Sequence, residues 1–145
     1  MGFFLVSGVN EHEASVENHR KGFAYALGLA KKHHSDVRVL FPDMALALTQ
    51  YLSEAIGDKV ASKLCSSSSK KINLEDVIFR ASWLGSVKSR SSFSEIVYLV
   101  IAPTLIELEL LTKTLGSNIE IVVVEFHAKP NELKRWTDDV KAKKI

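Results

Sequence analysis

The sequence predicts an α/β fold, a three-layer sandwich in which a mainly parallel sheet of four or five strands lies between two layers of helices. Apolar runs rich in β-branched residues alternate along the chain with longer amphipathic segments, which is the order of strands and crossover helices. The runs are continuously apolar, as expected of strands that are buried on both faces. All three prolines closely follow a predicted strand, where they break no ladder hydrogen bond.

Four segments have the composition of strands. Residues 3–9, 95–102 and 119–126 are continuous apolar runs, so we expect them to form buried parallel strands. Residues 36–41 are shorter and partly alternate between polar and apolar, which favours an edge strand. Numbered along the chain, these strands take the order 2-1-3-4 in a flavodoxin- or Rossmann-like sheet, and this is the order we predict.

The segments between and after the strands have the apolar spacing of helices. Thr104 and Glu107 form a capping-box pair, and Asn73 with Asp76 places a second N-cap residue three positions before an acid. Gly116 suits the end of the helix that Thr104 begins. We expect helices at residues 11–33, 44–56, 73–84, 105–115 and 131–144.

Residues 57–93 depart from this simple alternation. They contain seven lysines and arginines against three acids, a net charge of +4 in a chain whose total is +2. A serine run at residues 66–69 precedes Lys70 and Lys71. We expect a basic, Ser-rich helical insertion at one edge of a single domain spanning residues 1–145. A short fifth strand near residues 60–65 is the alternative.

Composition limits the class of protein. The chain has 145 residues, 46% of them apolar and 25% charged, as in an average soluble globular domain. No apolar run approaches the roughly 20 residues of a membrane span. The first residues lack the basic start and cleavage pattern of a signal peptide. Cys65 is the single cysteine, so we expect a reduced thiol in a cytoplasmic protein.

The first strand-to-helix turn, residues 7–13, lies where doubly wound folds bind phosphate. It has one glycine rather than the three of a dinucleotide fingerprint, and it has no P-loop lysine. Carboxylates such as Glu13 crowd the helix start and would repel a phosphate. His12 and His19 are seven residues apart, unlike the i, i+4 pairs of helical zinc sites. We therefore predict no nucleotide cofactor and no metal.

Polar residues at the carboxyl ends of the strands, and at the starts of the helices that follow, form the candidate ligand site, because ligands of open α/β sheets bind at this edge. These residues are Asn10, Asp43, Thr104, Glu125 and His127. Glu125 and His127 face the same side of one strand, so they suit acid–base chemistry, mutual pairing or capping of the next helix. The order 2-1-3-4 places the crevice between strands 3–9 and 95–102. Its acidic rim, without lysine or arginine, favours a neutral or cationic ligand.

The basic segment also suggests nucleic-acid binding, because cations contact phosphates and aromatic rings stack on bases. Phe79 and Trp83, however, are four residues apart in the predicted helix 73–84, a spacing typical of a core or interface face. We therefore expect a solvated basic face rather than a nucleic-acid site.

Residues 24–48, with A-Y-A-L-G-L-A and then D-V-R-V-L-F-P-D-M-A-L-A-L, resemble the first helix, second strand and following turn of DsrE-type sulfur-relay proteins. In that family a cysteine follows the third strand and a short loop leads to a helix, much as Cys65 precedes the predicted helix 73–84. Nearby lysines would favour a reactive thiolate at Cys65, but a structural thiol is the simpler interpretation. The layout of elements is also similar to that of the chi subunit of bacterial DNA polymerase III, a non-catalytic clamp-loader accessory protein.

Two classes of function remain open. The absence of a strong catalytic, metal or phosphate motif favours a non-catalytic binding or assembly module. Helix 44–56 is apolar almost all round, so its outer face needs a cover, which is either the helices of the insertion or a second copy of the chain. We predict a symmetric homodimer. The alternative is a small ligand-binding protein or enzyme, DsrE-like in its outline, that uses Asp43, Glu125 and His127.

Overall fold

The structure, a computed structural model, describes residues 2–7, 12–42, 50–65, 70–87, 93–116, 118–125 and 131–145. The strands are β1 (Phe3–Val6), β2 (Val37–Phe41), β3 (Lys71–Leu74), β4 (Val77–Trp83), β5 (Val97–Ile101), β6 (Glu120–Val124) and β7 (Lys143–Lys144). The helices are α1 (His12–His33), α3 (Gln50–Ile56), α4 (Asp58–Cys65), α5 (Leu105–Leu115) and α6 (Lys134–Val140), with a short 3-10 helix, η1 (Leu84–Ser86).

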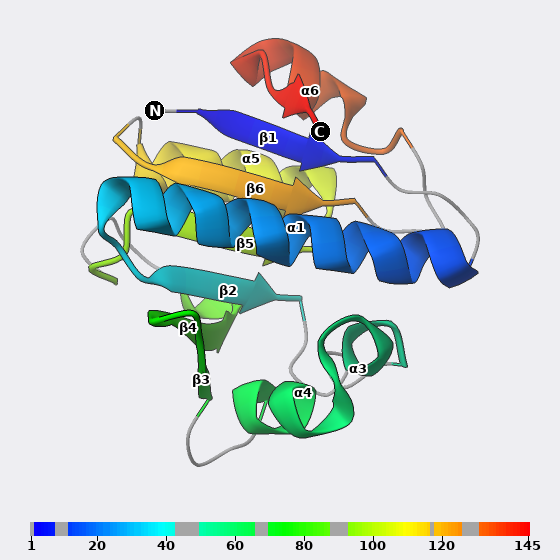
Figure 1. The fold of residues 1–145 in the computed structure, drawn as a ribbon. Coiled ribbons are helices and arrows are strands. Elements are labelled where there is room, and N and C mark those ends of the chain that lie inside the picture. The colour runs from blue at the N-terminus through cyan, green and yellow to red at the C-terminus, as the bar shows by residue number, and fades with distance from the viewer. Residues whose placement is uncertain are drawn as a thin grey trace.

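Within the described residues, the strands form one seven-stranded sheet of order β3-β4-β2-β5-β6-β1-β7. β3 pairs antiparallel with β4, and every other neighbouring pair is parallel. The parallel strands β4, β2, β5, β6 and β1 therefore end at the same edge of the sheet (Figure 1). The predicted α/β fold with a mostly parallel sheet is confirmed.

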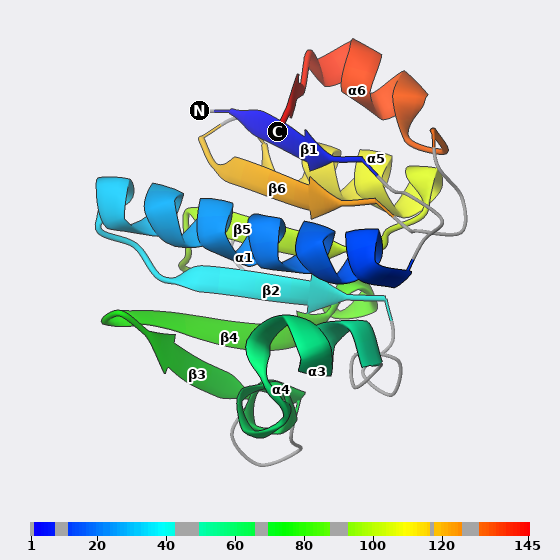
Figure 2. The same cartoon turned by 45° about the vertical axis from the view of Figure 1, so that its right-hand side comes forward.

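Helices cover both faces of this sheet (Figures 1 and 2). The front face, toward the viewer in Figure 1, is covered by α1, α3 and α4, whose Phe23, Leu52 and Leu64 join one buried cluster. The back face carries α5 and α6, whose Leu108 and Trp136 belong to a second cluster. Two apolar layers therefore lie against one sheet, as a three-layer arrangement requires.

The strand order differs from the predicted 2-1-3-4. Of the four expected strands, β2 lies beside β5, and β1 lies beyond β6, so the observed order is 2-3-4-1. α1 connects β1 to β2 and packs against β5 and β6, which lie between those two strands. A helix is about as wide as two neighbouring strands, so α1 fits across this pair and the two strands that it connects stay apart.

The prediction of a helix over residues 73–84 is wrong, because β3 and β4 form a hairpin there. Val77, Phe79 and Ala81 are buried on the front face, while the residues between them are half-buried, a period of two rather than 3.6. The backbone amide of Asp76 donates to Oδ1 of Asn73 at 3.0 Å, so this pair stabilises a turn and not a helix start.

Because of this hairpin, two further predictions fail. β2 is a central strand, since it pairs with β4 on one side and β5 on the other. The short strand considered near residues 60–65 is helix α4 instead. In its described residues, the predicted insertion at 57–93 therefore forms a helix on the front face, two strands that extend the sheet, and the short helix η1.

The remaining helix predictions hold in different degrees. Helix 11–33 is confirmed as α1, and helix 105–115 is confirmed as α5. Helix 131–144 is shorter than predicted, because α6 ends at Val140 and the chain then joins the sheet edge as β7. Only the end of helix 44–56 is described, as α3, and residues 43–49 lie outside the described residues.

Candidate functional site

The structure describes two of the five predicted site residues. Asn10, Asp43 and His127 lie outside the described residues. Thr104 is the N-cap of α5, where its side chain accepts a hydrogen bond from the amide of Glu107 at 3.2 Å. The amide of Thr104 in turn donates to Oε1 of Glu107 at 2.9 Å, which completes the predicted capping box. The side chain of Thr104 therefore stabilises a helix.

Glu125 directly follows β6 and is 5% exposed. Its Oε2 accepts a hydrogen bond from the amide of Leu133 at 3.3 Å, just before α6 begins. This contact matches the capping role that the sequence left open for Glu125. The carboxylate also borders a small cavity of about 130 Å³.

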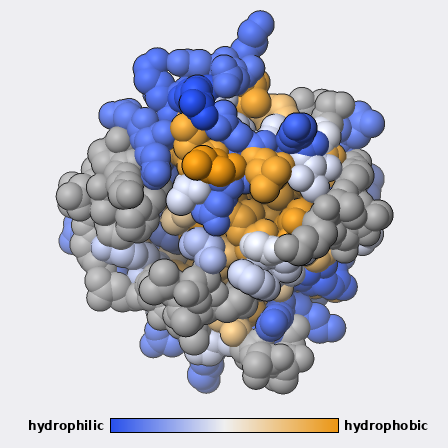
Figure 3. Space-filling model, turned by 180° about the vertical axis from the view of Figure 1, so that it is seen from behind, coloured by the Kyte–Doolittle hydropathy of each residue, from blue (hydrophilic) through white to orange (hydrophobic). Residues whose placement is uncertain are grey.

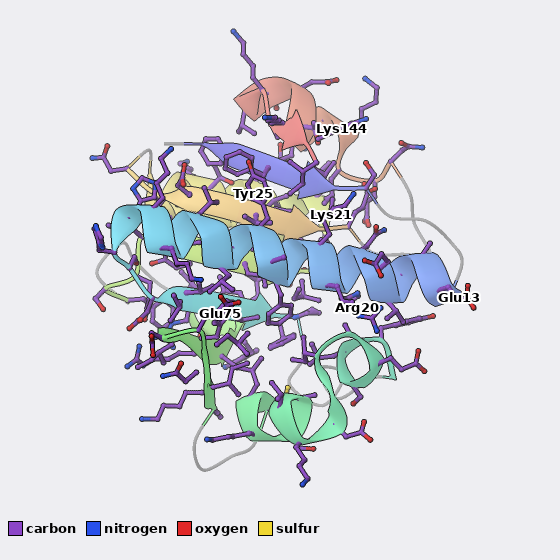
Figure 4. The ribbon with its side chains drawn as sticks, in the orientation of Figure 1. Glu13, Arg20, Lys21, Tyr25, Glu75 and Lys144 are labelled. Carbon is purple, nitrogen blue, oxygen red and sulfur yellow. The ribbon has the colours of Figure 1, made fainter. Side chains whose placement is uncertain are left out.

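That cavity lies near the carboxyl ends of β1 and β6. Its wall includes Ser7, Glu125, Asn131, Lys134 and Lys144. Lys134 pairs with Asp138 at 2.8 Å, and Figure 4 shows Lys144 on the short strand at the sheet edge. The crevice predicted between strands 3–9 and 95–102 does not form, because β6 lies between β1 and β5. The cavity at this edge carries lysines, contrary to the expected rim.

Cys65 ends α4 and is buried. Burial raises the pKa of its thiol to about 11, so the thiol stays protonated near neutral pH. A reactive cysteine needs the opposite shift in pKa. The helix expected after Cys65 is also replaced by the β3–β4 hairpin, which removes this part of the resemblance to DsrE-type proteins.

Two of the described histidines, His19 and His33, have hydrogen-bond partners within the protein. Nδ1 of His19 lies 2.8 Å from the carbonyl oxygen of Ser15, and Nε2 of His33 lies 2.9 Å from a carboxylate oxygen of Glu120. Within the part of the chain that the structure describes, no three His, Cys, Asp or Glu side chains gather as a metal site. None of the described helices combines the length and apolar character that a membrane span requires.

The described part of helix 44–56 is covered by the chain itself. α3 packs against α1 and α4, and its Leu52 is 1% exposed. Arg20 of α1 donates hydrogen bonds to the carbonyl oxygens of Glu54 and Ala55, at 2.8 and 3.2 Å, at the end of α3 (Figure 4). These contacts cap the helix and leave no broad apolar face on its described residues.

Polar and charged side chains occupy the back face of β3 and β4, away from α5 and α6. A groove of about 390 Å³ opens there, and we call it the basic groove. Its lining includes Arg38, Lys70, Lys71, Arg80 and Trp83. Lys70, Lys71 and Arg80, three of the seven cations in residues 57–93, therefore line this groove together with Arg38 of β2.

The two arginines of the basic groove are held by carboxylates. Arg38 donates two hydrogen bonds to Glu95, at 2.7 and 3.1 Å, and its guanidinium lies 4.1 Å from the ring centre of Phe93. Arg80 pairs with Asp36 at 2.9 Å. The two lysines of the groove, by contrast, form no ion pair with any other residue that the structure describes.

Trp83 ends β4 and is 53% exposed, so of the two predicted places, core or interface, the core is excluded for Trp83, whereas Phe79 is fully buried. A Cβ atom on Gly85 would lie 2.8 Å from Cζ3 of the Trp83 ring. The indole therefore packs closely against the backbone of Gly85. About half of its surface remains open to solvent beside the cations of the basic groove.

A second surface lies along α5. Ile106 and Leu110 are one helical turn apart and are 76% and 63% exposed. Beside them a cavity of about 230 Å³, which we call the α5–η1 groove, separates α5 from η1. Its lining is mainly apolar and includes Leu84, Gly85, Val87, Leu110 and Leu111. In Figure 3, which views the molecule from behind, orange residues gather near the centre of this face, with hydrophilic residues above them.

No protein-family model matches the chain, and no curated protein or solved structure matches it significantly. The functional conclusions below are therefore drawn from the geometry and chemistry of these surfaces.

Proposed function

We propose that this chain is a non-catalytic binding module that assembles with a second copy of itself through the α5–η1 groove. The observation that carries this proposal is the exposure of Ile106 and Leu110, 76% and 63%, beside an apolar cavity. Removing apolar surface from water contributes about 25 cal/mol per Å². A contiguous exposed apolar patch with a polar border is typical of an interaction site.

A second copy of the chain suits this patch for two reasons. Twofold assembly brings the same surface of each copy together, so the patch must complement itself, and an apolar stripe along one helix does. The stripe is also held rigidly, because Leu108, Leu111 and Leu115 on the opposite side of α5 are buried in the back cluster. A rigid helix loses little conformational freedom on association.

The non-catalytic part of the proposal is supported by the candidate residues that the structure describes. Thr104 is used in a capping box, and Glu125 accepts a hydrogen bond from the amide of Leu133. The pKa of Cys65 is raised to about 11, which disfavours thiolate chemistry. The proposal keeps the expectations of one domain over residues 1–145 and of a cytoplasmic location.

Light scattering on the purified chain tests the assembly. At about 100 µM we expect the mass of a dimer, and a lower average mass on dilution. The double variant Ile106→Lys/Leu110→Lys is expected to remain folded and monomeric, because both side chains are exposed. Ala24→Lys, an exposed position on α1, is the matched control and should stay dimeric. A monomeric mass for the parent chain would contradict the proposal.

The alternative function is binding or conversion of a small ligand at the Glu125 cavity. It is favoured by one observation, a carboxylate that is 5% exposed and borders a cavity of about 130 Å³. Most ligand pockets enclose roughly 300–1,000 Å³, so this cavity suits only a small molecule. Thermal-shift measurements with ATP, NAD and FMN should therefore show no stabilisation. The same measurement with much smaller molecules tests this alternative, and a shift of several degrees that Glu125→Gln abolishes would favour it.

A further inference from the structure

The basic groove on the back of β3 and β4 is lined by two lysines without an ion pair among the described residues, by an arginine paired with Asp36, and by an exposed tryptophan. Lys70, Lys71 and Arg80 line it together with Trp83. Cations bind the phosphates of nucleic acids, and exposed aromatic rings stack on unpaired bases. We propose that the basic groove binds a short single-stranded segment of RNA or DNA, a function separate from the proposed assembly through α5.

The sequence alone favoured a solvated basic face for two reasons, the small net charge of +2 and a predicted helix that placed Trp83 on the same apolar face as Phe79. The structure removes the second reason. In the structure the segment is strand β4, so Phe79 is buried at the front and Trp83 lies exposed at the end of the strand. Trp83 is also among the residues that line the groove with the cations.

The hairpin brings the charges together. Lys71 lies opposite Arg80 in the antiparallel ladder, and the carbonyl of Lys70 accepts a hydrogen bond from the amide of Ala81 at 2.8 Å. Trp83 follows Arg80 by three residues, which is about 10 Å along a strand. Phosphate-binding and base-stacking groups thus lie within the reach of a few nucleotides.

The charge of the groove is positive after its ion pairs are counted. Arg38 is held by Glu95 and by the hydroxyl of Ser82, so it is a structural residue and not a phosphate ligand. Arg80 forms an ion pair with Asp36, but the two side chains are 36% and 37% exposed, so the guanidinium remains accessible to a phosphate. With the two lysines, about three cations can contact phosphates, which gives a slope near −2 for log K against log salt concentration.

The absence of a side chain at Gly85 allows the indole ring of Trp83 to pack against the backbone there. A Cβ atom there would come within 3.2 Å of three atoms of the indole ring, so a larger residue would displace the ring. The contact involves the far end of an exposed side chain, so the ring can move without unfolding the hairpin. Gly85→Ala therefore changes the stacking surface while it leaves every charge in place.

Fluorescence anisotropy with labelled oligo-dT and oligo-U of about ten nucleotides tests the proposal. We expect roughly micromolar dissociation constants at about 50 mM salt, weakened about 20-fold at about 200 mM. Lys70→Ala/Lys71→Ala should weaken binding and flatten the salt dependence. The matched control, Lys21→Ala/Lys32→Ala on α1, removes the same charge from exposed positions elsewhere and should bind almost as the parent does.

Two variants separate stacking from charge. Trp83→Ala should weaken binding by about 5- to 150-fold, the range measured for base–aromatic stacking. Gly85→Ala should weaken binding in the same direction without changing the salt slope. Tryptophan emission provides a label-free measure, because an oligonucleotide should quench Trp83 but not Trp136, which is 1% exposed.

Several results would overturn the proposal. One is the absence of salt-dependent binding in the parent chain, and another is an equal loss of affinity in the Lys21→Ala/Lys32→Ala control. Equal affinity for a blunt DNA duplex would also contradict a single-stranded ligand. If polyglutamate of similar length binds as tightly, and Trp83→Ala changes neither affinity, the groove is a site for acidic peptides instead.

Discussion

The two ends of the sheet differ in how completely they are covered. β5 and β6 lie between α1 on the front and the back helices, and every residue of both strands is buried. β3 and β4 have helices on the front only, and along β4 buried and half-buried residues alternate (Figure 2). Both ends therefore contribute to the front core, whereas only the open end presents the side chains of its back face to solvent and to ligands.

The largest expected difference between the two ends is in packing energy. Leu99 of β5 is fully buried, whereas Ile78 of β4 is only half-buried, on the back face. Leu99→Ala should lower the free energy of unfolding by about 4 kcal/mol, and Ile78→Ala by about 1 kcal/mol. Urea denaturation of the two variants measures both. Equal losses would show that the back of β4 is packed as tightly as the centre of the sheet.

The border between the two ends is held by the Arg38–Glu95 pair, whose side chains are 14% and 3% exposed. Glu95→Ala leaves a largely buried guanidinium without its carboxylate and should destabilise the protein by about 3 kcal/mol. Arg80→Ala breaks a more exposed pair, so its cost should stay below about 1 kcal/mol. Denaturation curves measure both losses. A cost for Arg80→Ala as large as that for Glu95→Ala would contradict this difference in burial.

The same difference in coverage explains which parts of the fold were predictable. A strand that is buried on both faces has a continuously apolar sequence, and this pattern predicted β5 and β6. β4 is covered on one face and alternates instead, but Val77, Ile78 and Ala81, together with Leu84 directly after the strand, also fit one face of a helix. The hairpin turn at Glu75 and Asp76 lacks the usual Asn-Gly pair, so no turn signal favoured the strands.

The strand order was not predictable from local pattern, because it depends on which strands α1 covers rather than on any one segment. Of the described site residues, Thr104 and Glu125 were correctly placed at the carboxyl edge, and their capping contacts were among the alternatives. The basic groove was missed because it needs a pairing between β3 and β4 that positions Lys71 opposite Arg80. The exposed pair Ile106 and Leu110 could have been predicted from the sequence. Leu108, Leu111 and Leu115 already form the buried face of this helix, so two further apolar residues had to lie on its outer side.

A smaller effect concerns the helix that covers the back face. Thr104→Ala removes the side-chain acceptor of the α5 capping box and should cost about 1 kcal/mol, while Thr104→Ser should be nearly neutral. Thermal denaturation measures both changes. A neutral Thr104→Ala variant would show that the hydroxyl does not stabilise the helix and would reopen its role at a ligand site.

The smallest expected effect has the opposite sign and lies at the open end. Glu75 and Asp76 have φ values of 49° and 70° in the hairpin turn, a region that Asn and Gly adopt more readily. Glu75→Asn/Asp76→Gly should therefore stabilise the protein by about 0.5 kcal/mol, after loss of the exposed Lys31–Glu75 ion pair. Urea denaturation measures the change, and a clear destabilisation would contradict the hairpin.

The contrast between a covered and an open end is tested most directly by the two tryptophans. Trp83 at the open end is 53% exposed, and Trp136 at the covered end is 1% exposed, where its Nε1 donates to Oγ1 of Thr112. Iodide quenching of Trp83→Phe and Trp136→Phe isolates each residue in turn. We predict strong quenching when only Trp83 remains and almost none when only Trp136 remains. Equal protection of the two would contradict this contrast between the open and the covered end.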